Sequence, residues 1–179
     1  MSNQLVFESR RTRVWWAKAA AVASAAFVVA ALALALFWGL CALLVALRDI
    51  EVTGAQWGDA WTGVLRAALM AAAAALGGYA VTMLFRNTIA TLGLLFVAAV
   101  GSSLLISAMP MADPERWMLH ANGLTILADG YTYWSPCRSD MCEQVELVLP
   151  MSHGLVYFGV ALAVAVVASL VAFQRRDVP

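Results

Sequence analysis

The chain has 179 residues, of which 63% are hydrophobic and only 12% are charged. Because about a quarter of the residues in an average soluble domain are charged, a soluble protein of this composition would lack polar residues to cover its surface. The composition therefore excludes an ordinary soluble domain and indicates a protein that has lipid as its solvent. The formal net charge is zero, which gives no indication of a nucleic-acid partner.

Four apolar stretches are expected to cross the membrane as helices. The first runs from Val14 to Leu47 and contains no charged residue after Lys18. It is longer than the roughly 20 residues that a span needs, so it must tilt or project into the cytoplasm. It also exceeds the apolar core of a cleavable signal peptide, about 7–15 residues, and is interpreted as a retained anchor. The other three spans are Trp61 to Phe85, Thr88 to Met109 and Gly154 to Phe173.

The connections between these spans differ in length. The second and third spans are joined at Arg86-Asn87, which predicts an antiparallel helical hairpin. Residues 110–153 form a larger loop domain with turn signals at Asp129-Gly130 and Ser135-Pro136. The predicted organisation is a cytoplasmic segment (1–13), three transmembrane helices (14–109), an extracytoplasmic loop domain (110–153), a fourth transmembrane helix (154–174) and a cytoplasmic tail (175–179).

The placement of the charged residues predicts the orientation, because cytoplasmic loops carry an excess of lysine and arginine. With the N-terminus inside, the inner side holds Arg10, Arg11, Arg13, Lys18, Arg86, Arg175 and Arg176. The outer side then holds Arg48, Arg66, Arg116 and Arg138 together with most of the acidic residues. We therefore expect an all-α membrane protein of four spans with both termini in the cytoplasm.

Cys137 and Cys142 lie in the predicted outer loop, where an oxidising compartment permits a disulfide. The alternatives are two free thiols or a metal site, and two cysteines without nearby histidines are a weak ligand set. Cys41 lies inside the first span and is interpreted as a small apolar packing residue.

Sequence motifs for catalysis or cofactor binding are absent. The chain contains no Walker motif, HExxH, GxSxG or dinucleotide-binding glycine pattern, so no catalytic residue, metal ligand or cofactor is predicted. The two histidines, His120 and His153, are interpreted as ordinary loop and interface residues. Arg66 lies near the start of the second span, where its side chain either snorkels to the outer interface or is buried as a functional group.

Three stretches together resemble the permeases of type-2 ABC exporters. The basic stretch ESRRTRVWWAK (8–18) resembles the R-x-R-V-x-x-A-K segment that leads into a membrane helix of that family. The stretch GYAVTMLFRNT (78–88) is similar to its hairpin between two spans, and FQRRDV (173–178) is similar to the ending of many actinobacterial members. Members usually have six spans, so the four spans here correspond to the last four.

The resemblance implies a translocation pathway formed by two permease chains, as a homodimer or heterodimer, in the bacterial cell membrane. Two separate ABC ATPase subunits would dock from the cytoplasm and carry out the ATP hydrolysis. The outer domain would act as a lid or exit gate, with residues 123–127 and 145–149 as short helices lying in the outer interface.

The N-terminal segment would then couple the spans to the ATPase. The candidate coupling residues are Phe7, Glu8, Arg10, Arg11 and Arg13, which offer an apolar contact and charges for pairing. The alternative is an interfacial anchor whose arginines are held by anionic lipid head groups.

Two functions therefore remain open at the level of sequence. The first is a permease subunit of an ABC exporter, and the second is a non-transporting accessory or assembly subunit that braces a larger membrane complex. A membrane-embedded redox or hydrolytic enzyme has little support, because the spans contain no cluster of ligands or nucleophiles.

Overall fold

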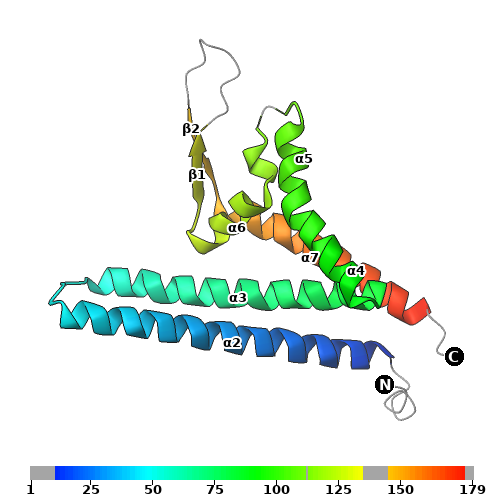
Figure 1. Cartoon of the computed structure of the whole chain (residues 1–179), viewed down its shortest axis with the longest axis horizontal. Helices are drawn as coiled ribbons and strands as arrows, with labels where there is room; N and C mark the ends of the chain where they lie inside the picture. Colours follow the sequence, from blue (N-terminus) through cyan, green and yellow to red (C-terminus); the bar gives the residue numbers. More distant parts are fainter. Residues whose placement is uncertain (1–10, 112, 135–144, 176–179) are drawn as a thin grey trace. The chain divides into compact units, whose positions relative to one another are not determined.

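A computed structural model describes residues 11–111, 113–134 and 145–175 of the chain (Figure 1). These residues belong to two compact units, which divide between residues 84 and 85 and again between residues 164 and 165; the first unit contains the described residues 11–84 and 165–175, and the second contains those in between. Four described helices are long and apolar enough to cross a membrane, namely Thr12–Leu47, Gly54–Phe85, Thr88–Ala108 and Met151–Arg175. The predicted number of spans is thus confirmed for the described part of the chain.

The first two long helices belong to the first unit. Helix α2 (Arg11–Leu47) has 37 residues, or about 55 Å at 1.5 Å per residue, against a hydrocarbon core of about 30 Å. Helix α3 (Gly54–Phe85) begins seven residues before the predicted Trp61. The earlier start follows from a capping box, in which the Thr53 N–H donates to Gln56 Oε1 at 2.9 Å and the Gln56 N–H donates to Thr53 Oγ1 at 3.4 Å.

The core of the first unit lies where α2, α3 and the C-terminal part of α7 (Met151–Arg175) meet. Its buried residues are Trp15, Ala19 and Ala80. The two alanines leave room for close helix packing, as small residues do in membrane proteins. Partly buried side chains surround this cluster, namely Leu76, Tyr79, Ala165, Val166, Leu170 and Phe173.

The third span consists of three consecutive segments in the second unit. These are α4 (Thr88–Phe96), the π-helix η1 (Val97–Gly101) and α5 (Ser102–Ala108). Asn87 caps α4, because its side-chain oxygen accepts the Ile89 N–H at 2.9 Å and the Ala90 N–H at 3.2 Å. Ser103 Oγ, in the first turn of α5, donates to the carbonyl of Ala99 in η1 at 3.4 Å, so this serine hydroxyl is satisfied within the same span.

A small module, which we call the connecting module, is formed by residues 113–134 and 145–153, between α5 and the body of α7. It contains the 3-10 turn η2 (Glu115–Trp117), α6 (Leu119–Leu127) and the antiparallel strands β1 (Tyr131–Trp134) and β2 (Glu146–Leu149). Tyr131 pairs with Leu149, and Trp134 pairs with Glu146.

The hairpin of β1 and β2 corrects two predictions. The chain is mostly helical but not all-α, and residues 146–149 form a strand where a short helix was expected. Leu147 and Leu149 face the more buried side while Glu146 and Val148 are exposed, which is the two-residue alternation of a strand. The predicted helix at residues 123–127 is confirmed as part of α6.

The chain reverses direction between α6 and β1 at the predicted Asp129-Gly130 turn. Both residues have positive φ, 63° for Asp129 and 140° for Gly130. The Gly130 N–H donates to the Thr125 carbonyl at 2.9 Å, which is the six-to-one bond of a Schellman ending. The turn therefore ends α6 and leads the chain directly into β1.

Candidate functional site

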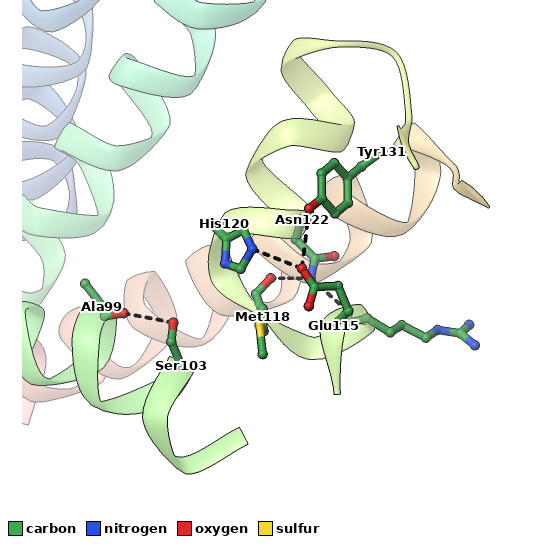
Figure 2. Close-up of polar contacts among 8 residues, drawn as sticks. Ala99, Ser103, Glu115, Met118, His120, Asn122 and Tyr131 are labelled. Carbon is green, nitrogen blue, oxygen red and sulfur yellow. Dashed lines mark hydrogen bonds and ion pairs between the residues drawn. The ribbon is translucent and has the colours of Figure 1, made fainter. Parts of the chain in front are cut away.

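One group of polar contacts in the connecting module is centred on Asn122, which has no exposed surface and is drawn beside Met118 in Figure 2. Its Nδ2 group donates to the carbonyl oxygens of Arg116 at 3.0 Å and Met118 at 2.9 Å. A flipped amide would place Oδ1 against these two acceptors, so the orientation of Asn122 is fixed by its partners. The same side chain thereby ties η2 to α6.

His153, in the first turn of α7, completes this network. Its Nδ1 lies 2.9 Å from Asn122 Oδ1, and its Nε2 lies 3.2 Å from Arg116 Nε. The ring also meets Trp117 edge-on, with centroids 6.2 Å apart. His153 therefore contacts both η2 and α6 and fixes them to the start of α7.

Close packing at Gly154 strengthens the same junction. A Cβ atom at this position would lie 2.5 Å from the Asn122 carbonyl oxygen and would overlap Thr125 Oγ1. Thr125 is itself fully buried, and its hydroxyl donates to the Asn122 carbonyl at 2.8 Å. Only glycine allows α6 to lie this close to the first turn of α7.

A second set of polar contacts in the same module is centred on Glu115 (Figure 2). Its Oε1 accepts the Tyr131 hydroxyl at 3.4 Å and lies 3.2 Å from His120 Nε2, whose side chain is about half exposed. Burial raises the pKa of Tyr131, and the charge and hydrogen bond of Glu115 raise it further. Tyr131 therefore stays protonated and serves as a donor.

Asp113 and Tyr133 form a third contact. The Tyr133 hydroxyl donates to Asp113 Oδ2 at 2.6 Å, and the Tyr133 ring stacks on Tyr131 with centroids 6.0 Å apart. Burial, followed by the hydrogen bond and charge of Asp113, raises the pKa of Tyr133 to about 12. Asp113 Oδ1 is buried and has no hydrogen-bond partner within the described residues.

The polar contacts of the connecting module hold its own elements together. Within residues 11–111, 113–134 and 145–175, no group of three or more His, Cys, Asp and Glu side chains is arranged to hold a metal ion. The convergent groups are hydrogen bonded to one another, and most link separate elements of the module.

The predicted coupling residues fall only partly in the described chain. Phe7, Glu8 and Arg10 lie outside it, and Arg11 is the first residue of α2. Arg13 is exposed on α2, two residues before the buried Trp15. The segment predicted to dock an ATPase therefore continues directly into a helix that enters the core of the first unit.

The predicted disulfide residues Cys137 and Cys142 lie outside the described residues. Cys41 is half-buried in α2 as a free thiol, in agreement with a packing role. Arg66 is half-buried in α3, about a turn and a half from Trp61, which is exposed.

The sequence interpretation missed the network around Asn122 and treated His153 as an ordinary interface residue. A signal was available in α6, where Asn122 and Thr125 are three residues apart and share a helix face. Both are buried, whereas Leu124 and Leu127 are exposed. The buried face of α6 thus carries these two polar residues beside Ala121 and Ile126.

Comparison with known protein families, with curated proteins and with solved structures finds no match. The functional proposal therefore rests on the sequence and structure of this chain alone.

Proposed function

We propose that this chain is the transmembrane permease subunit of an ABC exporter, working with a second permease chain and separate ATPase subunits. The observation that carries the proposal is the order of three family-like stretches along the four spans. The basic stretch leads into α2, the stretch 78–88 covers the junction of α3 and α4, and RRDV begins at Arg175, the last residue of α7. Each stretch lies at a helix end, as it would in a permease.

The proposed location is the bacterial cell membrane, with both termini in the cytoplasm. The support is the distribution of charge about the four spans, since the N-terminal segment, the α3–α4 junction and the C-terminal tail are basic. The α2–α3 connection and residues 110–150 carry most of the acidic residues. In this orientation the connecting module lies outside the cell as the lid or exit gate, and a Cys137–Cys142 disulfide would close its loop.

The proposed coupling uses the path from the N-terminal segment into the core. ATP-driven closure of the ATPase pair would move residues 5–13, and α2 would carry that movement to Trp15 four residues after its start. Trp15 contacts α3 through Tyr79, with ring centroids 5.4 Å apart, and α7 through Ser169. A shift of α2 would thus change the populations of the inward-closed and outward-open arrangements.

Co-purification tests this function directly. We expect the chain to co-purify with an ATPase encoded beside it, and we expect the double charge reversal Arg10→Glu, Arg11→Glu to lower the recovered ATPase by about tenfold, the loss produced by about 1.4 kcal/mol. Arg48→Glu, which alters an exposed arginine of the α2–α3 connection, is the control and should leave recovery unchanged. The accessibility of a C-terminal tag verifies that the double variant keeps its orientation, because these arginines also contribute to topology.

Two results would contradict the coupling proposal. One is a chain that never recovers an ATPase, which favours the accessory or assembly subunit. The other is unchanged recovery for the double reversal, which favours the segment as a lipid anchor.

A further inference from the structure

Helix α2 carries its larger aliphatic side chains on a face that points away from the rest of the first unit. Leucines recur along this face at spacings of four, three and four residues, and each is more than half exposed, namely Leu36, Leu40, Leu43 and Leu47. Each of them follows a half-buried residue by two positions, which is about 200° around the helix, and these residues are Leu34, Trp38, Cys41 and Val45. The exposed leucines, which we call the leucine stripe, therefore lie opposite the packed face of α2.

The length of α2 limits how much of the leucine stripe lipid can cover. Lys18 is the last charged residue at the start of this helix, and a hydrocarbon core of about 30 Å takes up about 20 helical residues. At the average tilt of about 20°, a core that begins after Lys18 ends near Gly39. Three of the four stripe leucines then lie beyond the hydrocarbon.

Helix α3 places the edge of the hydrocarbon core at a similar level. The two helices belong to the first unit and run antiparallel (Figure 1), and the Trp15 and Tyr79 rings are in contact with centroids 5.4 Å apart. Asp59 is exposed on α3, 20 residues or about 30 Å from Tyr79, and the same rise from Trp15 ends near Ala35 of α2. An exposed carboxylate is costly in hydrocarbon, so the core ends at or before this level. The excess length of α2 therefore projects at the α2–α3 connection, where the leucine stripe lies.

Leucines outside the hydrocarbon need a protein surface to cover them, because soluble surfaces rarely expose large apolar patches. A second copy of the chain matches this stripe, since spacings of three and four residues let the side chains of two helices interdigitate. Two copies related by an axis along the membrane normal present the same stripe at the same depth, with their α2 helices parallel. Directly after the stripe, Arg48 and Asp49 are both exposed, so each arginine of the pair can meet the aspartate of the other copy.

We propose that the leucine stripe of α2 joins two copies of this chain in a parallel helix pair. The leucines supply the contact, whereas an exposed pair of Arg48 and Asp49 adds little to it and serves the alignment of the two helices. The helix pair gives a surface to the second permease chain of the proposed function, but it requires neither transport nor an ATPase.

Cysteine cross-linking in native membranes tests the helix pair. A background without native cysteines carries Cys41→Ala, Cys137→Ser and Cys142→Ser. In this background, Leu40→Cys or Leu43→Cys provides a single cysteine in the stripe, and oxidation should join either variant into a covalent dimer. Phe37→Cys is the matched control, because Phe37 is 57% exposed, as Leu40 (53%) and Leu43 (55%) are, but lies about a quarter turn around the helix from the stripe. It should give little or no dimer.

A dissociation measurement tests the strength of the contact without added cysteines. We expect Leu40→Ala with Leu43→Ala to raise the dissociation constant of the dimer in lipid bilayers by about tenfold, a loss of about 1.4 kcal/mol. Single-molecule photobleaching of labelled full chains at several protein-to-lipid ratios measures this constant. Leu104→Ala with Leu105→Ala removes two exposed leucines of α5 instead and should leave the constant unchanged.

Three results would overturn the helix pair. They are no covalent dimer at either stripe position, as when lipid or another protein covers the stripe, equal cross-linking of Phe37→Cys, and an unchanged dissociation constant in the stripe variant. Recovery of an ATPase separates these outcomes from the proposed function. A dimer that never recovers an ATPase keeps the helix pair and contradicts the coupling, whereas an ATPase bound to a chain that forms no dimer does the reverse.

Discussion

The indole Nε1–H of Trp15 donates a hydrogen bond to Ser169 Oγ at 3.2 Å, although 154 positions separate the two residues. Neither side chain has exposed surface. The contact joins the first turns of α2 to the last turns of α7, and Tyr79 of α3 packs on the same indole. Trp15 therefore joins the ends of three helices of the first unit, α2, α3 and α7. It lies directly after the segment proposed to meet an ATPase.

This contact predicts a graded loss of stability. Ser169→Ala leaves a buried indole N–H without an acceptor and should lower the free energy of unfolding by about 1–2 kcal/mol. Trp15→Phe keeps an aromatic ring but leaves a void, so it should lower the free energy of unfolding somewhat more than Ser169→Ala does. Trp15→Ala should lower it by about 3–5 kcal/mol. Unfolding of the full chain in mixed micelles measures all three.

Ser24→Ala is the matched control, because Ser24 is exposed on α2 and its hydroxyl bonds only the Ala21 carbonyl. It should change the stability by less than about 0.5 kcal/mol. A Ser169→Ala chain as stable as the parent would show that the buried bond does not hold the helix ends together.

Gly154 gives a second prediction, at the junction of α6 and α7. Gly154→Ala places a methyl group against the Asn122 carbonyl and Thr125, so α6 must move away from α7. We expect a loss of about 1–3 kcal/mol, the usual cost of overpacking. The thermal transition of the full chain and hydrogen exchange of α6 measure the effect.

The control for this change lies in the same helix. A Cβ at Gly159 would meet no atom within 4 Å, so Gly159→Ala should be neutral or raise stability by up to about 1 kcal/mol through helix propensity. Equal behaviour of the two variants would contradict the close approach of α6 to α7.

The sequence predicts the spans well and the connecting module poorly, for a physical reason. A span is a local property, since about 20 consecutive apolar residues suffice to identify it. The run 145–149 is too short for its periodicity to distinguish helix from strand, and its strand depends on pairing with β1. The network of Arg116, Asn122 and His153 exists only once three separate elements meet. The start of the third span at Thr88 agrees with the prediction, whereas α3 begins at Gly54 and not at the predicted Trp61, because the cap at Thr53 was not recognised.

Tyr133 predicts a dependence of stability on alkaline pH. Its pKa is raised from 10.0 to about 12, first by burial and then by the bond to Asp113. The folded state thus holds the phenol proton more tightly than the unfolded chain does. The contribution of this group is complete below pH 10 and is lost as the pH rises toward about 12.

Tyr133→Phe should therefore flatten the fall in stability over this window, and the phenolate absorbance should lose a component that titrates toward about pH 12. Tyr157→Phe removes a phenol from α7 instead and serves as the control. If Tyr133→Phe and the parent chain lose stability in parallel between pH 10 and 12, the Asp113–Tyr133 bond does not carry the effect.

The cysteines of the loop between β1 and β2 provide the last prediction. If Cys137 and Cys142 form a disulfide, alkylation of the unfolded chain without reductant should modify Cys41 alone, and reduction should add two further alkyl groups to the mass. Cys137→Ser with Cys142→Ser should give one modified cysteine under both conditions.

The same pair also bears on orientation, because a disulfide persists in an oxidising compartment and not in the bacterial cytoplasm. Two thiols that label freely in native membranes would contradict the disulfide. Labelling of both by a membrane-impermeant reagent in intact cells would still support an outer connecting module, whereas labelling only after lysis would contradict that orientation.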